Sequence, residues 1–177
     1  MQSKLKVLFF FFIAVSLIAA GCTGKGQPDA SGTALNNSTA SSGSENLYLQ
    51  EFDQGYQHHV IAKSDFENAT TLWNADNFTD AIDLFSAAGD EFSLAADHYH
   101  NMYALAGNDT ERTFADNMEG AAIDLDLASD RFIMSINESV AGNETNALEY
   151  FSEGQALVDD STNKTDSSMQ SMPSMFQ

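Results

Sequence analysis

The residues best suited to chemistry in this chain are its histidines. If the chain reverses near Asp76, residue 58 lies 18 positions before the turn and residue 98 lies 22 positions after it. Their heights along two antiparallel helices then differ by about four residues, or roughly 6 Å. His58, His59 and His98 could therefore approach one another, with Asp97 and Glu119 near the same level. Imidazole nitrogens bind copper and zinc, so the spacing gives a metal site as one hypothesis.

A second set of candidate metal ligands lies near the C-terminus. Met169, Met172 and Met175 recur at every third position, and thioether sulfur is a soft ligand suited to Cu(I). Similar methionine tracts occur in exported copper carriers. The sequence has neither the Glu-x-x-His of di-iron bundles nor a His-Glu-x-x-His motif. We therefore expect no cofactor, and keep an exported copper-binding protein as the alternative hypothesis.

Catalytic motifs are missing from the sequence. It contains no nucleophile elbow, phosphate-binding loop, catalytic-triad spacing or dinucleotide fingerprint. Paired carboxylates such as Asp124 with Asp126 do occur, but 26 of the 177 residues are acidic. Such pairs therefore do not single out a general acid or base. The sequence favours a protein that is not an enzyme.

The first 22 residues have the pattern of an export signal. Two lysines precede an apolar run from Val7 to Ala20, which is too short and wrongly flanked for a spanning helix. The run leads into Ala19-Ala20-Gly21-Cys22, which resembles the lipobox of secreted lipoproteins. The resemblance implies cleavage before Cys22, a lipid on that residue and a location on the extracellular face of the cell membrane. Because Cys22 is the only cysteine, the mature domain can have no internal disulfide.

Asparagines in the glycosylation triplet Asn-x-Ser/Thr are unusually frequent. Ser and Thr make up 30 of 177 residues, so chance would place about two of the 13 asparagines in such a triplet. The sequence has eight: Asn36, Asn37, Asn68, Asn77, Asn108, Asn137, Asn143 and Asn163. We expect several of them to carry N-linked sugar. A lipobox combined with many such sites resembles archaeal surface proteins, which indicates an archaeal source.

The charge of the chain limits its partners. The formal net charge is −19, and removal of the two lysines of the signal makes it −21. So acidic a surface repels nucleic acid and anionic lipid headgroups. We therefore expect the protein to meet the membrane only through its lipid anchor, to bind no nucleic acid, and to have a protein partner that the sequence does not identify.

Apolar residues between positions 47 and 160 recur every three or four residues, which predicts four amphipathic helices. Asn77, Asn108 and Asn143 are expected N-caps, because an asparagine oxygen can accept a free N–H of the first turn. Gly107 and Gly142 are expected to end the preceding helices in the left-handed conformation. The loops are then short, so successive helices are antiparallel.

The predicted fold is all-α, an up-down-up-down four-helix bundle with two long central helices. The breaks recur 31 and 35 residues apart, close to the tetratricopeptide period, so tetratricopeptide-like helical hairpins are the alternative. The predicted organisation is a signal peptide (1–21), a disordered tether (22–46), the bundle (47–160) and a disordered tail (161–177). Phe85, Phe92, Tyr99, Leu125 and Phe132 are expected in the core.

These features together predict a membrane-anchored surface lipoprotein whose bundle is a non-enzymatic spacer or interaction module. With turns near residues 76, 107 and 142, Asn68, Asn77, Asn137 and Asn143 are expected towards the end away from the tether. Asn108 and Asn163 are expected near the tether end.

Overall fold

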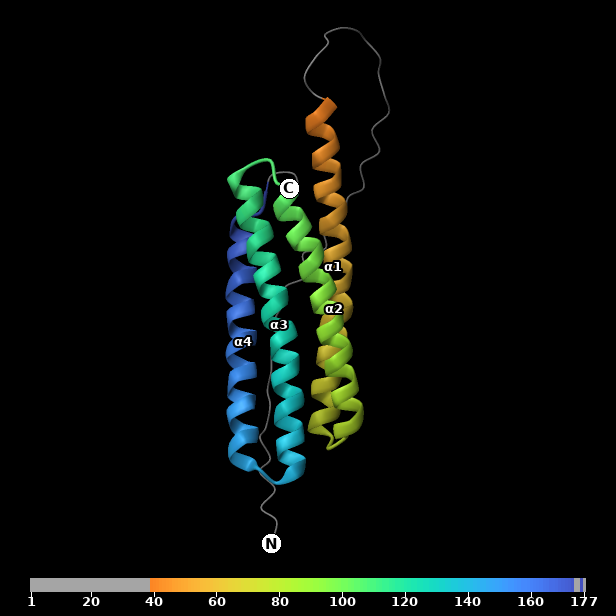
Figure 1. Cartoon of the computed structure of the whole chain (residues 1–177), viewed down its shortest axis with the longest axis vertical. Coiled ribbons are helices and arrows are strands. Elements are labelled where there is room, and N and C mark those ends of the chain that lie inside the picture. The colour runs from red at the N-terminus through yellow and green to blue at the C-terminus, as the bar shows by residue number, and fades with distance from the viewer. Residues whose placement is uncertain (1–38, 174–175, 177) are drawn as a thin grey trace. The chain divides into compact units, whose positions relative to one another are not determined.

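The computed structural model describes residues 39–173 and 176. The predicted signal, Cys22, Asn36, Asn37 and Met175 lie outside these residues. The described chain forms α1 (Thr39–Asn74), α2 (Phe78–Leu105), α3 (Asp109–Ala141) and α4 (Glu144–Gln170), and it contains no strand (Figure 1). The prediction of an all-α, up-down-up-down four-helix fold is confirmed.

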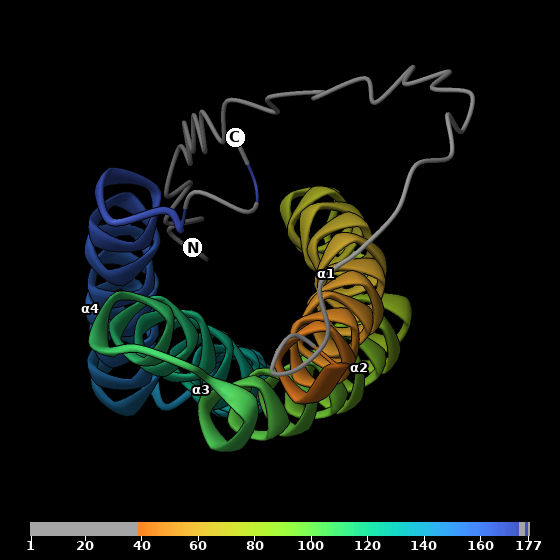
Figure 2. The same ribbon diagram turned by 90° about the horizontal axis from the view of Figure 1, so that it is seen from above.

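The helices pack in chain order. α2 packs against α1, α3 against α2 and α4 against α3, whereas the backbones of α1 and α4 do not come close (Figure 2). None of the helices in the described chain is both long and apolar enough to cross a membrane. Because the backbones of α1 and α4 are not in contact, the bundle is open between its first and last helices.

Aromatic side chains bridge this opening near the α1–α2 turn. The Trp73 ring of α1 lies 5.7 Å from Phe132 of α3 and 5.9 Å from Phe151 of α4, centroid to centroid. Phe66 adds an edge-to-face contact to Phe132 at 5.6 Å. Rings of this size bury large apolar areas and prefer such tilted geometries, so they join helices whose backbones are too far apart for small side chains to meet.

A second aromatic cluster joins α1 to the C-terminal segment. The Phe176 ring, beyond the end of α4, lies 4.5 Å from Phe52 of α1 and 5.3 Å from Phe114 of α3. Beside them the buried Tyr48 hydroxyl donates a hydrogen bond of 3.0 Å to the backbone carbonyl of Glu111. Phe176 therefore packs against the core at this end.

The predicted core is largely confirmed. Phe85, Phe92, Tyr99 and Phe132 are buried, and Leu125 is partly buried against the same cluster. Each of these residues follows the previous one at a multiple of the helical repeat on α2 or α3, which is why spacing alone located them.

The turns lie where the sequence placed them, but two of the three predicted caps differ in detail. The Asn108 side chain accepts the backbone N–H of Glu111 at 3.0 Å, as expected of an N-cap. Asn77 and Asn143 occupy the N-cap positions of α2 and α4 without making that bond. Their side-chain amides instead donate to nearby carboxylates, both at 2.7 Å. The Asn108 amide also donates to a carboxylate, so the difference lies in the backbone: Asn108 is extended, as N-cap residues usually are, whereas Asn77 and Asn143 are not.

The two glycines predicted to end helices also behave differently. Gly142 is left-handed, with φ at 81°, as predicted. The prediction for Gly107 was wrong, because α2 ends at Leu105, its C-cap Ala106 is extended, and Gly107 does not have a positive φ. Its N–H instead donates to the Glu111 carboxylate at 2.6 Å. That bond draws the loop directly into the start of α3.

Two predicted domain boundaries were also wrong. α1 begins at Thr39 within the expected tether, and α4 continues to Gln170 within the expected disordered tail. Ser161 and Ser168 are buried, and the Ser168 hydroxyl donates to the carbonyl four residues earlier. Small hydroxyl side chains that bond to their own helix can pack closely against a neighbour, which the polar composition of this segment conceals.

Candidate functional site

The structure brings His58 of α1 and His98 of α2 together. Their imidazole rings stack with centroids 5.5 Å apart and an interplanar angle of 12°. Nδ1 of His58 lies 2.6 Å from a carboxylate oxygen of Glu91, and Nδ1 of His98 lies 2.7 Å from Glu51. These four partly buried residues form a carboxylate–imidazole–imidazole–carboxylate row, which we call the histidine row.

The row arises from one spacing used twice. Glu51 and His58 are seven residues apart on α1, and Glu91 and His98 are seven apart on α2. Seven residues are about two helical turns, so each pair shares a face. Because α1 and α2 are antiparallel, the glutamate of each helix meets the histidine of the other. Sequence reasoning missed both glutamates, although the repeated Glu-x6-His spacing was the signal for them.

A close approach of the helices supports this arrangement. A Cβ atom at Gly55 of α1 would lie 2.8 Å from the Tyr99 ring and 3.1 Å from the His98 Cβ of α2. No real side chain fits at such distances without a shift. Glycine at this position therefore lets α1 and α2 come close enough for the carboxylate–imidazole bonds to form.

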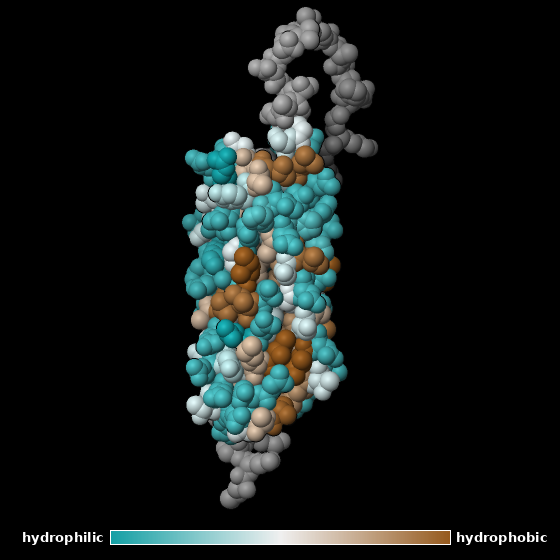
Figure 3. Space-filling view, in the orientation of Figure 1, coloured by the Kyte–Doolittle hydropathy of each residue, from teal (hydrophilic) through white to brown (hydrophobic). Residues whose placement is uncertain are grey.

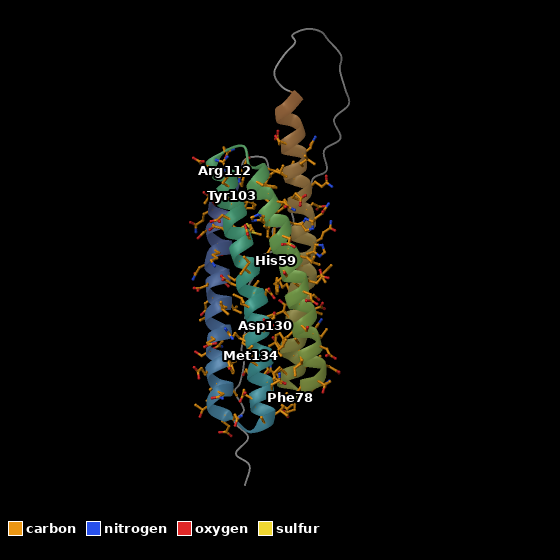
Figure 4. All side chains as sticks on the ribbon, in the orientation of Figure 1. His59, Phe78, Tyr103, Arg112, Asp130 and Met134 are labelled. Carbon is orange, nitrogen blue, oxygen red and sulfur yellow. The ribbon has the colours of Figure 1, made fainter. Side chains whose placement is uncertain are left out.

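His59 faces a different part of the molecule. Its ring packs edge-on against Phe92, with centroids 5.3 Å apart, and its Nδ1 is buried without a hydrogen-bond partner among the described residues (Figure 4). Burial, together with the charge of Lys63, lowers the pKa of His59 to about 4. The ring is therefore neutral at neutral pH, and it behaves as a core side chain separate from the histidine row.

The other candidate ligands are dispersed. Glu119, expected near the histidine row, instead lies 3.1 Å from His100. Met169 is exposed on α4, whereas Met172 packs against the cluster that contains Tyr48 and Phe114. Across residues 39–173 and 176, no group of three or more His, Cys, Asp or Glu residues is arranged to hold a metal ion. Among the residues that the structure describes, the histidine row is the one place where predicted ligands meet.

All six asparagine triplets within the described chain are exposed: Asn68, Asn77, Asn108, Asn137, Asn143 and Asn163. Asn77 and Asn143 lie in the α1–α2 and α3–α4 turns, which are at the same end of the bundle because neighbouring helices are antiparallel (Figure 1). Asn68 and Asn137 lie about two turns or less from these loops. Asn108 lies in the turn at the opposite end. The asparagines are thus placed as expected, and their modification stays a prediction.

The described surface is strongly acidic. Only Asp29 of the 26 acids lies outside the described residues, leaving 25, whereas only four of the seven Lys and Arg residues lie within them. Each of those four makes an ion pair with a carboxylate: Lys63 with Glu67, Arg112 with Asp109, Arg131 with Glu153 and Lys164 with Asp124. The excess of carboxylates therefore has no cation of its own to neutralise it within this part of the chain.

Comparison with known proteins gives no family. No protein-family model matches the chain, and neither the curated proteins nor the solved structures contain a significant match. The proposals that follow therefore rest on the residues and the geometry described above.

Proposed function

We propose that this protein is a lipid-anchored cell-surface spacer of archaeal type, without enzymatic activity, that carries N-linked sugar on the end of a rigid helical bundle. The anchor is the lipid on Cys22. The segment that follows it connects the anchor to the bundle on the extracellular face of the membrane. The bundle holds the sugar away from the membrane and presents its flanks to a partner protein.

The observation that carries this proposal is the placement of the asparagine triplets. Four of the six described triplets gather towards one end of the bundle, and all six are exposed. The helix α2 has 28 residues and is therefore about 42 Å long. Sugars at one end of such a bundle would stand a helix length away from sugars at the other. That spacing suits a protein that separates the cell surface from its surroundings.

The charge supports the same function. A bundle with 25 acids and four bases repels anionic headgroups and other copies of itself. Repulsion falls off within about 10 Å at 0.1 M salt, so it acts mainly on surfaces that approach closely. An anchored bundle of this charge is therefore pushed off an acidic membrane while its anchor holds it there.

Peptide mapping by mass spectrometry on protein isolated from its own membranes tests the proposal. We expect a diacylated N-terminal peptide that begins at Cys22, and glycopeptides at Asn68, Asn77, Asn137 or Asn143. Asn101 and Asn146 are matched internal controls, because both are exposed but lie outside the triplet. If the peptides that contain these four asparagines all lack sugar, the triplets are only helix caps and chance matches, and the proposal is wrong.

A copper-binding function is the alternative, and the histidine row is the observation that favours it. Metal-ligating histidines usually donate a hydrogen bond from one ring nitrogen to a carboxylate and bind the metal through the other nitrogen. His58 and His98 each have Nδ1 beside a carboxylate in this way. Copper titration of the dialysed protein, with a His58→Gln, His98→Gln double variant as control, separates the two functions. The spacer predicts no stoichiometric copper in either protein, whereas the alternative predicts binding that the double variant loses.

A further inference from the structure

The outer face of α3 carries an exposed apolar stripe. Ile123, Leu127 and Met134 have 42%, 43% and 40% of their surface exposed, respectively. They are spaced by four and seven residues, which places them on one face of the helix over about 16 Å. In Figure 3 an apolar patch lies at mid-height over α3 and α4, within a mostly hydrophilic surface. We call these three residues the α3 stripe.

No helix of the bundle covers this stripe, because α3 meets its neighbours through other faces. Against α2 it presents Asp126, whose carboxylate lies 3.0 Å from a Cβ built at Gly89. Against α4 it presents Asp124, which accepts a 2.6 Å hydrogen bond from Lys164. The sides of α3 are therefore occupied, and the α3 stripe faces outward between them.

One edge of the stripe is held in place by Arg131. Its side chain lies 3.1 Å from the Glu153 carboxylate, and its guanidinium is 6.0 Å from the centre of the Tyr150 ring on α4. The same guanidinium lies 3.4 Å from the sulfur of Met134. These contacts restrict the Arg131 side chain, so binding has less of its conformational freedom to remove.

The other edge is crowded with carboxylates. Asp130 lies on α3 between Leu127 and Met134 in sequence (Figure 4), and Asp126 is one turn earlier. Burial and the charges of Asp130 and Asp90 raise the pKa of the Asp126 carboxyl. Burial is the largest cause and the two neighbouring carboxylates add to it, so several negative charges lie along this edge.

We propose that the α3 stripe is the docking surface for a basic amphipathic helix of a partner protein. This inference deepens the proposed function, since it names the flank and the partner chemistry of the interaction module. Apolar residues of the partner helix would cover Ile123, Leu127 and Met134, and its Lys or Arg residues would meet Asp130, which is exposed beside them. This is the helix-on-surface mode in which anchors recur at intervals of three or four residues. A second copy or an anionic membrane fits poorly, since both would bring like charge to this face.

A pair of synthetic peptides tests the inference on the mature chain carrying Cys22→Ser. Both are 18-residue helices with the same leucine positions, one with lysine and the other with glutamate at the remaining charged positions. We expect fluorescence anisotropy to detect binding of the lysine peptide only. Comparable binding of the glutamate peptide would overturn the proposal, because the acidic edge would then play no part.

Two double variants locate the binding. L127S with M134S removes the stripe, while V140S with L148S removes two exposed apolar residues elsewhere, with 65% and 48% exposure. We expect the stripe variant to weaken binding at least tenfold and the control to change it less than twofold. Equal weakening in both variants, or none in the stripe variant, would overturn the proposal. If circular dichroism shows that the stripe variant is unfolded, I123T takes its place with the same expectation at threefold or more.

Sedimentation velocity of the same proteins examines the other occupants. A wild-type chain that dimerises, with a stripe variant that does not, would assign the face to a second copy and overturn the partner helix. Binding to vesicles of anionic lipid that the stripe variant loses would assign it to a membrane, with the same consequence. Neither result changes the lipid or sugar found by peptide mapping. The proposal of docking at the α3 stripe can therefore be wrong while the spacer proposal holds, and the reverse.

Discussion

Replacement of His59 by phenylalanine should remove a defined part of the protein's sensitivity to acid. In the folded chain the pKa of His59 is lowered to about 4 by burial, with a smaller contribution from Lys63. In the unfolded chain it is near 6.5. Between these values the unfolded state binds a proton that the folded state excludes, so stability falls as the pH is lowered from about 6.5 to about 4.

The size of the effect follows from the difference between the two pKa values. One pKa unit corresponds to about 1.4 kcal/mol, so a difference of roughly 2.5 units gives an upper bound of about 3.5 kcal/mol. The ring is not wholly shielded from solvent, which reduces the expected loss to about 2 kcal/mol between pH 7.5 and pH 4.5. Above pH 7 the ring is neutral in both states and contributes nothing to the pH dependence.

Urea unfolding at pH 7.5, 6.0 and 4.5 measures this loss. Carboxylates also titrate in this range, but they are common to both proteins, so the difference between wild type and His59→Phe isolates the histidine. His100→Gln is the control, because His100 is exposed. We expect the His59→Phe protein to lose about 2 kcal/mol less than wild type over this range. Equal losses in the two proteins would refute the assignment of a buried, neutral His59.

Four further substitutions test the packing and electrostatics of the helices. Asp126→Asn should raise the free energy of unfolding at pH 7 by about 0.5 kcal/mol. The raised pKa of Asp126 shows that the folded state disfavours its charged carboxylate, which asparagine replaces with a neutral amide. The gain is small because solvent screens part of the unfavourable charge. That gain should disappear in urea titrations at pH values low enough to protonate the carboxyl in both states. Gly154→Ala should lower the melting temperature, with a net cost of about 1 kcal/mol, because its Cβ would lie 2.8 Å from the buried Phe132 ring; an unchanged melting temperature would show that the ring moves freely. Asn108→Ala should cost about 1 kcal/mol in urea unfolding, and Asn143→Ala less, because only Asn108 accepts a capping bond; a larger loss at Asn143 would contradict that ranking.

The sequence was sufficient for the number, order and direction of the helices. Short polar breaks at residues 76, 107 and 142 coincide with the observed turns, and the aromatic positions of α2 and α3 form the core as expected. It was less informative for α1. There Tyr56 and Val60, which follow Phe52 at helical spacing, are exposed, while small residues such as Gly55 and Ala62 are buried. Small residues carry little hydropathy signal, although they decide where two helices come close.

The candidate site was predicted in part. Counting residues from the turn placed His58 and His98 at similar heights, and the two rings do meet. The count gives height along a helix but not the face on which a residue lies, so it could not show that His59 points into the core. The glutamates of the histidine row were not predicted, since a carboxylate is unremarkable in so acidic a chain. Likewise, the buried serines of α4 looked like a disordered tail, because composition does not reveal which hydroxyls bond to their own helix.

Peptide mapping of the protein from its own membranes is the most direct test of the proposal that it is an anchored, sugar-bearing spacer. We expect a mature chain that begins at lipid-modified Cys22 and carries sugar on at least two of Asn68, Asn77, Asn137 and Asn143. A chain with an unmodified N-terminus elsewhere and bare asparagines at all four positions would contradict it.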